Sequence, residues 1–152
     1  MRAVFVVLVL ACFAAFFITQ RLKHTPTAIQ DFKRTPRFSP FRAGHLKEEE
    51  ISFKLAHADE VTVSILNSSE DVVATLLRSY PAPRYKQFSL RWNGHSGTAA
   101  SHRVTHTASG RAILLPENRG PVAPPGEYRV RVSLRHQDRT LVLPESFTLV
   151  GE

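Results

Sequence analysis

The chain has 152 residues, one cysteine and a formal net charge of +7, which leaves room for one domain and short additional segments. Because Cys12 is the only cysteine, no disulfide joins two parts of the chain, and packing alone must hold the core together. Residues 21–47 carry seven Lys/Arg and one acidic residue, whereas residues 48–152 carry twelve of each kind. A nucleic-acid-binding domain carries its own basic surface, so this neutral balance argues against nucleic acid as a partner.

The N-terminus is strongly apolar. Residues 3–18 are sixteen uncharged and almost wholly apolar residues, without the polar positions of an amphipathic helix. Together with Thr19 and Gln20, the run approaches the roughly 20 residues of a membrane-spanning helix. We therefore predict a membrane anchor over residues 1–20. The side chains expected to contact lipid include Val4, Phe5, Leu8, Leu10, Phe16 and Phe17.

Two other interpretations of this run stay open. A cleaved signal peptide needs small residues after the apolar run, but Thr19-Gln20-Arg21-Leu22 follows it. A lipoprotein signal that ends at Cys12 would leave only eleven residues for export. The positive-inside rule would keep the basic C-terminal flank in the cytoplasm, whereas short N-terminal apolar runs generally act as export signals. We predict a single-pass protein of the cell membrane with its domain outside the cytoplasm.

Residues 21–47 are predicted to form a basic linker that contains Pro26, Pro36 and Pro40. Two roles are open for this segment. It is either a solvated spacer or a segment attracted to anionic headgroups or cell-wall polymers, at about 1 kcal/mol per basic residue near such a surface.

From residue 48 to the C-terminus, apolar and polar residues alternate, which is typical of strands with one buried face. The clearest runs are 51–55, 61–65, 88–92, 128–134, 140–143 and 147–149, and residues 71–77 and 111–115 are rich in strand formers. About seven strands separated by turn residues predict an all-β domain over 48–152, an antiparallel β-sandwich of the immunoglobulin or fibronectin-III kind. The expected core contains Phe53, Val63, Phe88, Leu90, Trp92, Tyr128, Val130 and Val132.

The segment "PPGEYRVRVSL", residues 124–134, combines a turn signal with a two-faced strand. Pro125 fixes φ and Gly126 tolerates positive φ, which predicts a type II turn. Arg129 and Arg131 then face the solvent. They are either a solubilising face or contacts for an anionic partner.

Several segments, in order, resemble a known family. They are "FSP" at 38–40, "ISFKL" at 51–55, "VTVSILNSSEDVVATL" at 61–76, "FSLRWNG" at 88–94 and "PPGEYRVRVSL" at 124–134. Together they are similar to the FlgD-like immunoglobulin-type domain, named for the bacterial flagellar hook-capping protein, and to small membrane-anchored bacterial proteins that carry this module. The resemblance covers about residues 38–150 and implies an immunoglobulin-like sandwich with no established activity.

The chain departs from this family at two places. Relatives often continue "FSP" with an acidic, glycine-rich loop suited to calcium, but this chain reads "FSPFRAGHLKEEE", so we predict no calcium site. The segment between Gly94 and Pro124 is also much longer than the family pattern, which makes it a candidate binding surface.

Three histidines lie in that segment: His95, His102 and His106. A spacing of four suits two metal ligands on a helix, but the surrounding Gly, Ser and Thr disfavour a helix, and no further ligand is close. "GHSG" at 94–97 resembles a nucleophile elbow, but its second glycine comes one residue too early. The sequence therefore predicts no catalytic residue, cofactor or metal, and the histidines are candidate partner contacts.

These features predict a non-enzymatic module held in the lipid bilayer by its N-terminal helix, which binds or scaffolds an envelope protein or polymer. The expected contact surface is the 94–124 segment or an exposed sheet edge. Two alternatives are a metal-dependent envelope enzyme that uses His95, His102 and His106, and an accessory subunit of a membrane complex.

Overall fold

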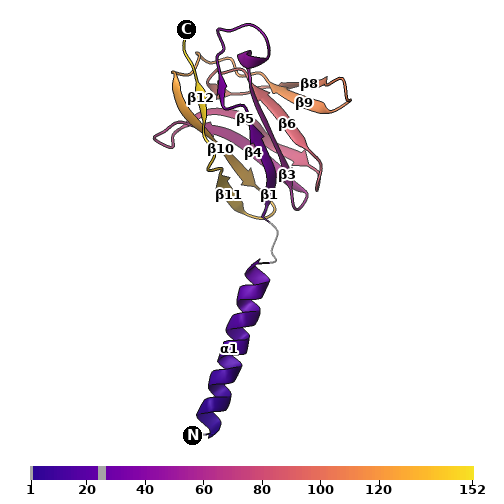
Figure 1. Cartoon of the computed structure of the whole chain (residues 1–152). Coiled ribbons are helices and arrows are strands. Elements are labelled where there is room, and N and C mark those ends of the chain that lie inside the picture. Colours follow the sequence, from indigo (N-terminus) through magenta and orange to yellow (C-terminus); the bar gives the residue numbers. More distant parts are fainter. Residues whose placement is uncertain (1, 24–26) are drawn as a thin grey trace.

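The computed structural model describes residues 2–23 and 27–152, and it consists of one helix followed by a β domain (Figure 1). Met1 of the expected anchor and residues 24–26 of the expected linker lie outside the described residues. The helix is α1 (Arg2–Lys23), and a short 3-10 helix, η1, spans His45–Lys47. The strands are β1 (Ile29–Arg34), β2 (Arg37–Phe38), β3 (Glu49–Leu55), β4 (Asp59–Leu66), β5 (Val72–Ala82), β6 (Phe88–Trp92), β7 (Gly97–Thr98), β8 (His102–His106), β9 (Ala112–Pro116), β10 (Gly126–Leu134), β11 (Arg139–Val142) and β12 (Phe147–Leu149).

The strands form two sheets, which confirms the all-β domain. One sheet has the order β1-β3-β6-β9-β8, and the other has the order β2-β12-β10-β4-β5-β7, with β11 also pairing with β10. Most neighbours are antiparallel, but β2 with β12, β5 with β7 and β6 with β9 are parallel. The purely antiparallel expectation is therefore corrected at the short strands, which return to the sheets from long connections.

One core joins the two sheets. Alternate side chains of β3 and β6 in the first sheet meet those of β4 and β10 in the second, as the period of two requires. Trp92 is fully buried, with its ring centroid 5.6 Å from that of Phe38 and 5.7 Å from that of Tyr128. The eight residues expected in the core are all buried.

The first two strands of the β domain differ from the sequence-based expectation. Residues 29–38 do not continue a linker; they form β1, antiparallel to β3, and β2, parallel to β12. Phe38 is 2% exposed, and Ile29 and Phe32 pack against the core from the edge. The sequence does not predict these strands, because β1 has a register shift between Gln30 and Lys33 and β2 has only two residues, so neither shows a clear alternation of apolar residues.

The expected turn at residues 124–127 also differs. Gly126 has a φ of 157° and is the first residue of β10, so the chain bends at Pro125 and goes directly into the strand. The Tyr128 hydroxyl donates a hydrogen bond to the Pro124 carbonyl and holds this entry in place.

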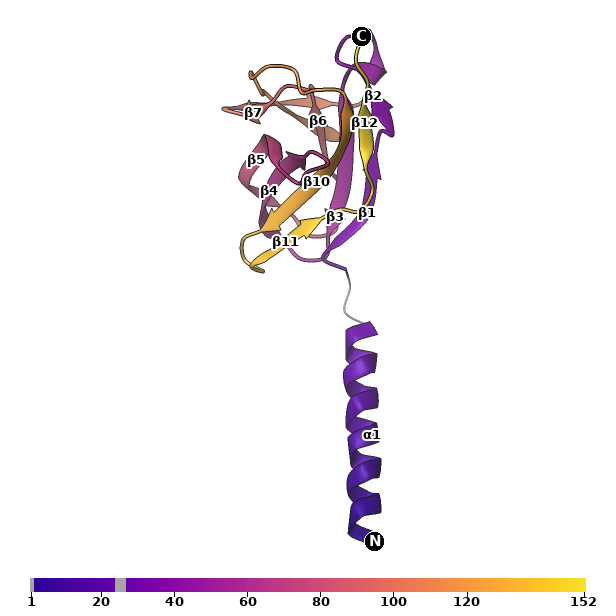
Figure 2. The same ribbon diagram turned by 90° about the vertical axis from the view of Figure 1, so that its left-hand side faces the viewer.

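The helix α1 projects away from the β domain (Figures 1 and 2). The six apolar residues predicted to contact lipid are all exposed, at 58–71% of their surface. Among the residues that the structure describes, no helix is both long and apolar enough to span a membrane.

Candidate functional site

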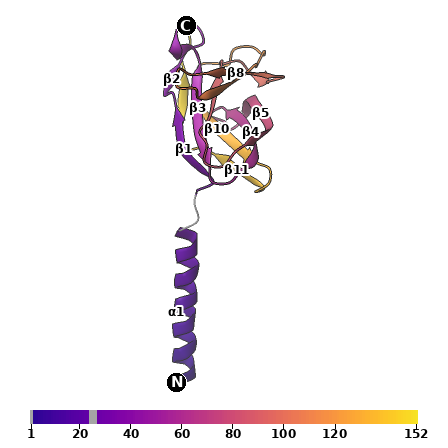
Figure 3. The ribbon, with the colours of Figure 1, turned by 90° about the vertical axis from the view of Figure 1, so that its right-hand side faces the viewer.

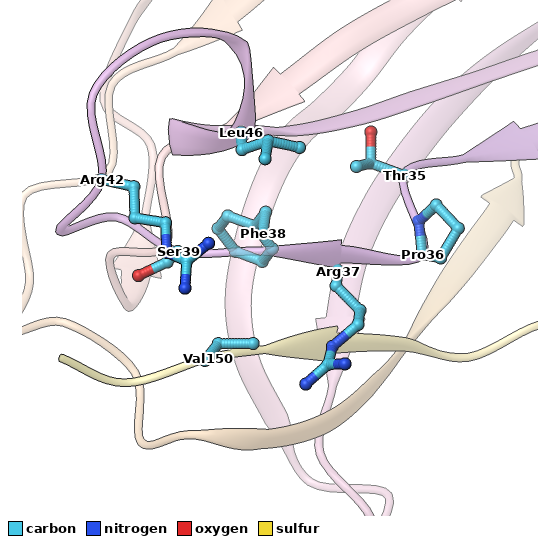
Figure 4. Close-up of a pocket in the computed structure, with 8 residues that line it drawn as sticks. All are labelled: Thr35, Pro36, Arg37, Phe38, Ser39, Arg42, Leu46 and Val150. Carbon is cyan, nitrogen blue, oxygen red and sulfur yellow. The ribbon is translucent and has the colours of Figure 1, made fainter.

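A cavity of about 440 Å³ lies at one end of the β domain (Figure 4). Its walls come from the β1–β2 connection, β2, the loop before η1, η1 itself and the residue after β12. They are Thr35, Pro36, Arg37, Phe38, Ser39, Arg42, Leu46 and Val150. The β2 strand and the C-terminus lie at the end of the domain opposite β1's start, where the chain arrives from α1 (Figures 1 and 2). The cavity therefore opens at the end remote from the helix connection.

Backbone hydrogen bonds hold the walls in place. Ser39 N–H donates to the Leu46 carbonyl at 2.9 Å, and Arg42 N–H donates to the Ser39 carbonyl at 3.1 Å, which folds the loop over β2. Val150 N–H donates to the Phe38 carbonyl at 2.8 Å and ties the C-terminal segment to the other side. Phe38 is itself packed against Trp92 and Phe147 in the aromatic core, so this part of the cavity wall is continuous with the core.

The lining has an apolar wall and two cationic groups. Arg37 and Arg42 are its only charged residues, and neither takes part in an ion pair of the described residues. Ser39 is 2% exposed, and its hydroxyl has no hydrogen-bond partner in the described part of the chain. In Figure 4, Arg42 extends toward Ser39 while Arg37 extends toward the strand before Val150. A guanidinium group recognises carboxylate or phosphate through paired N–H donors, so the lining suits an anionic group next to an apolar one.

A buried glutamate, Glu49, contacts Thr35, one of the residues that line the cavity. Glu49 is fully buried, its Oε1 accepts a hydrogen bond from Thr35 N–H at 2.9 Å, and its Oε2 has no partner in the described structure. Burial raises the pKa of Glu49 to about 9, although the Thr35 N–H and the nearby Arg34 favour the ionised form. Glu49 is therefore neutral at physiological pH and does not offset the positive charge of the cavity.

The three histidines of the long segment are not brought together. His95 has a structural role, because its Nδ1 lies 2.7 Å from the Gly120 carbonyl oxygen and its own carbonyl accepts from Trp92 Nε1. His102 and His106 both lie on β8, where four residues span about 13 Å at 3.3 Å per residue. The described residues contain no group of three or more His, Cys, Asp or Glu that would hold a metal ion.

The long segment itself is ordered into strands. It contributes β7, β8 and β9, and Asn118 fastens it to the domain by donating to the carbonyls of Thr75 and Gly97 at 3.2 and 2.7 Å. Arg129 and Arg131 lie along β10, opposite Leu66 and Ser64 of β4, and neither lines the cavity.

Sequence reasoning missed the residues of the cavity. Arg37, Ser39 and Arg42 fall within the predicted linker, residues 21–47, because this region is basic and contains prolines. The only local signal was the concentration of positive charge in residues 21–47.

No protein-family model matches the chain, and no curated protein is significantly similar to it. The resemblance to the FlgD-like domain therefore stays a prediction that rests on the quoted motifs.

Proposed function

We propose that the chain is a non-enzymatic, single-pass module of the cell membrane. In this proposal its immunoglobulin-like domain lies outside the cytoplasm and binds or scaffolds an envelope protein or polymer. The observation that carries the binding role is the cavity with Arg37 and Arg42 at the end remote from the helix connection. An accessory subunit of a membrane complex would use the same surface, and no observation favours the metal-dependent enzyme.

The strand order supports the immunoglobulin-like assignment. In the variable-type immunoglobulin fold, strands A, B and E share one sheet, and G, F, C and C′ are neighbours in the other. Here β1-β3-β6 follow the first order and β12-β10-β4-β5 follow the second. The hydrogen bond from the Tyr128 hydroxyl to the Pro124 carbonyl resembles the tyrosine corner of such domains.

The exposed helix supports membrane attachment. Its described apolar side chains, over residues 4–19, are exposed on all sides rather than along one stripe. A lipid environment removes the cost of keeping this surface in water.

The chemistry of the cavity supports a partner with an acidic group. Two arginines without an ion pair, an apolar wall and no acidic residue in the lining leave a net positive site. A volume of about 440 Å³ lies in the range of ordinary ligand pockets, about 300–1,000 Å³. The partner is expected to insert a carboxylate or phosphate that is flanked by an apolar group.

Site-specific photo-crosslinking in intact cells tests the binding role. A photoreactive phenylalanine analogue in place of Leu46, which lines the cavity, should give one discrete adduct. The double variant R37Q/R42Q should reduce this adduct by roughly tenfold or more, because each hydrogen bond to a charged group contributes about 1.5–3 kcal/mol.

The matched control replaces Val72, an exposed apolar residue of β5, with the same analogue. The variant R129Q/R131Q controls for loss of positive charge elsewhere. An adduct at Leu46 that persists in R37Q/R42Q, or one that appears equally at Val72, would contradict binding at the cavity.

A further inference from the structure

The strand β8 is an open edge of the five-stranded sheet. It is the last strand in the order β1-β3-β6-β9-β8 and pairs only with β9, over five consecutive residues without a register shift. Four of its five residues are exposed, and Val104 is 50% exposed. The β8–β9 hairpin extends from the body of the domain (Figures 1 and 3). Its outer edge is therefore accessible.

The hydrogen-bond pattern identifies the groups on this edge. Thr107 N–H donates to the Arg111 carbonyl, and Glu117 N–H donates to the Ser101 carbonyl. The backbone N–H and C=O groups of Ser101 and Thr107 therefore point toward β9. Backbone groups alternate in direction along a strand, so the N–H and C=O groups of His102, Val104 and His106 point away from β9. Pro116, which lies opposite His102 and has no N–H, fits this pattern.

The other edges of the two sheets are protected in the ways that natural proteins use. β1 has a register shift between Gln30 and Lys33, and Asp31 has a φ of 50°. The part of β5 beyond its short pairing with β7 contains Ser79 at a φ of 44° and then Pro81. β2 and β7 have two residues each, and β11 has four. Within residues 27–152, β8 is the longest edge without a bulge, a positive φ or a proline.

The residues on this edge are symmetric about Val104. His102 and His106 flank it at equal distances, and all three present their backbone groups outward. We propose that β8 pairs antiparallel with β8 of a second copy of the chain, in a two-fold register centred on Val104. In this register His102 faces the partner's His106 and Val104 faces the partner's Val104, so every outward group finds a partner through about six backbone hydrogen bonds.

Side-chain chemistry permits this register. Val104 lies opposite Leu114 of β9, so pairing covers its exposed surface beside an apolar neighbour. Arg103 faces the partner's Thr105 rather than a second arginine, and its guanidinium is already paired with Glu117 at 3.0 Å. A second copy is favoured over an unrelated strand because the order His102, Val104, His106 reads the same in both directions. In the two-fold register, the same outward backbone groups are therefore paired in both copies.

Disulfide trapping of the full chain in membranes or neutral detergent tests the register. In a Cys12→Ser background, V104C should form a dimer on mild oxidation, because hydrogen-bonded antiparallel partners have Cα atoms about 5.5 Å apart, within disulfide reach. A mixture of H102C and H106C chains should cross-link to each other, whereas either variant alone should cross-link far less.

The matched control is V142C, on the edge of β11, where the valine is 41% exposed. V104P provides a second test, because it removes an outward N–H and leaves the bonds to β9 intact; it should abolish the dimer in light scattering without loss of fold. Equal cross-linking at V142C, a dimer that survives V104P, or trapping of a different protein at V104C would overturn the pairing of two copies. None of these results depends on the cavity or its ligand.

Discussion

Glu49 is the residue at which burial and charge conflict most directly. Its side chain is fully buried and one carboxyl oxygen has no partner in the described structure, so the ionised form is poorly solvated. Its folded-state pKa of about 9 lies above the ordinary value of 4.5. Between these pH values the folded state binds more protons than the unfolded state, so the free energy of unfolding falls as pH rises.

We expect E49Q to remove this dependence. The free energy of unfolding of the wild type should fall between about pH 5 and pH 9, by at most about 1.4 kcal/mol per pH unit. E49Q keeps an acceptor for the Thr35 N–H and cannot ionise, so it should be more stable than the wild type at pH 8 and similar to it near pH 5. Urea unfolding followed by the fluorescence of Trp92, the only tryptophan, measures the difference.

The control is E145Q. Glu145 is exposed, takes part in no ion pair of the described residues, and its charge does not act on Glu49, so its replacement should leave the fall in stability between pH 5 and pH 9 as in the wild type. Parallel stability curves for E49Q and the wild type would rule out an elevated pKa.

At the scale of elements, the N-terminal strands β1 and β2 are integral to the β domain. β1 adds to the first sheet and β2 adds to the second, so this short stretch joins the two layers. Phe38 of β2 packs in the core, with its ring centroid 6.1 Å from that of Phe147. A variant that begins at residue 39 would lose both strands, whereas one that begins at residue 27 would keep them.

We expect F38A to destabilise the domain by about 3–5 kcal/mol, because it leaves a cavity among aromatic rings. F41A changes the same residue type three positions later, where the ring is 51% exposed, and should cost less than about 0.5 kcal/mol. Urea titration of both variants compares the midpoints. Similar midpoints would mean that β2 is not fixed in the core.

At the scale of the whole molecule, an apolar helix and an all-β domain occur in one chain. The domain carries its own core and does not use α1 to complete it, because the buried cluster begins at Ala28. The exposed apolar surface of α1 therefore needs another environment. The proposed membrane role supplies one.

We expect the wild type to stay with membranes through an alkaline carbonate wash. V7R/L10R should release it, because an arginine at the centre of a spanning helix costs about 2.5–3.5 kcal/mol on insertion scales. V72R, at an exposed site of β5 outside the proposed strand pairing, is the control and should stay membrane-bound. Digestion of the domain by external protease in intact cells tests its side of the membrane. A wild type released by carbonate would contradict the anchor.

Local pattern determined much of the fold. The period-two alternation placed Phe88–Trp92 at the bounds that the strand has in the structure, and residues 51–55 and 128–134 within two residues of theirs. The alternation predicts these strands correctly because a strand with one buried face needs an apolar residue at every second position, and this pattern is visible in consecutive residues. The apolar run at residues 3–18 predicted the only helix longer than a turn in the described chain, because an unbroken run of apolar residues is also a local signal.

Only the tertiary structure decided the rest. A spacing of four suits two metal ligands on a helix, but β8 is a strand. His102 and His106 therefore lie too far apart to bind the same metal ion. Arg37, Arg42 and Val150 line the same cavity although Val150 is distant from the other two in sequence. The burial of Glu49 likewise depends on segments distant in sequence, so no local pattern predicts the cavity or the buried carboxyl group. The amino-acid sequence by itself determined which residues are buried in the core, because the pattern of apolar residues is local. Which edges stay open and which charges lack partners was decided by long-range pairing, because those properties belong to neighbours that meet only in the folded chain.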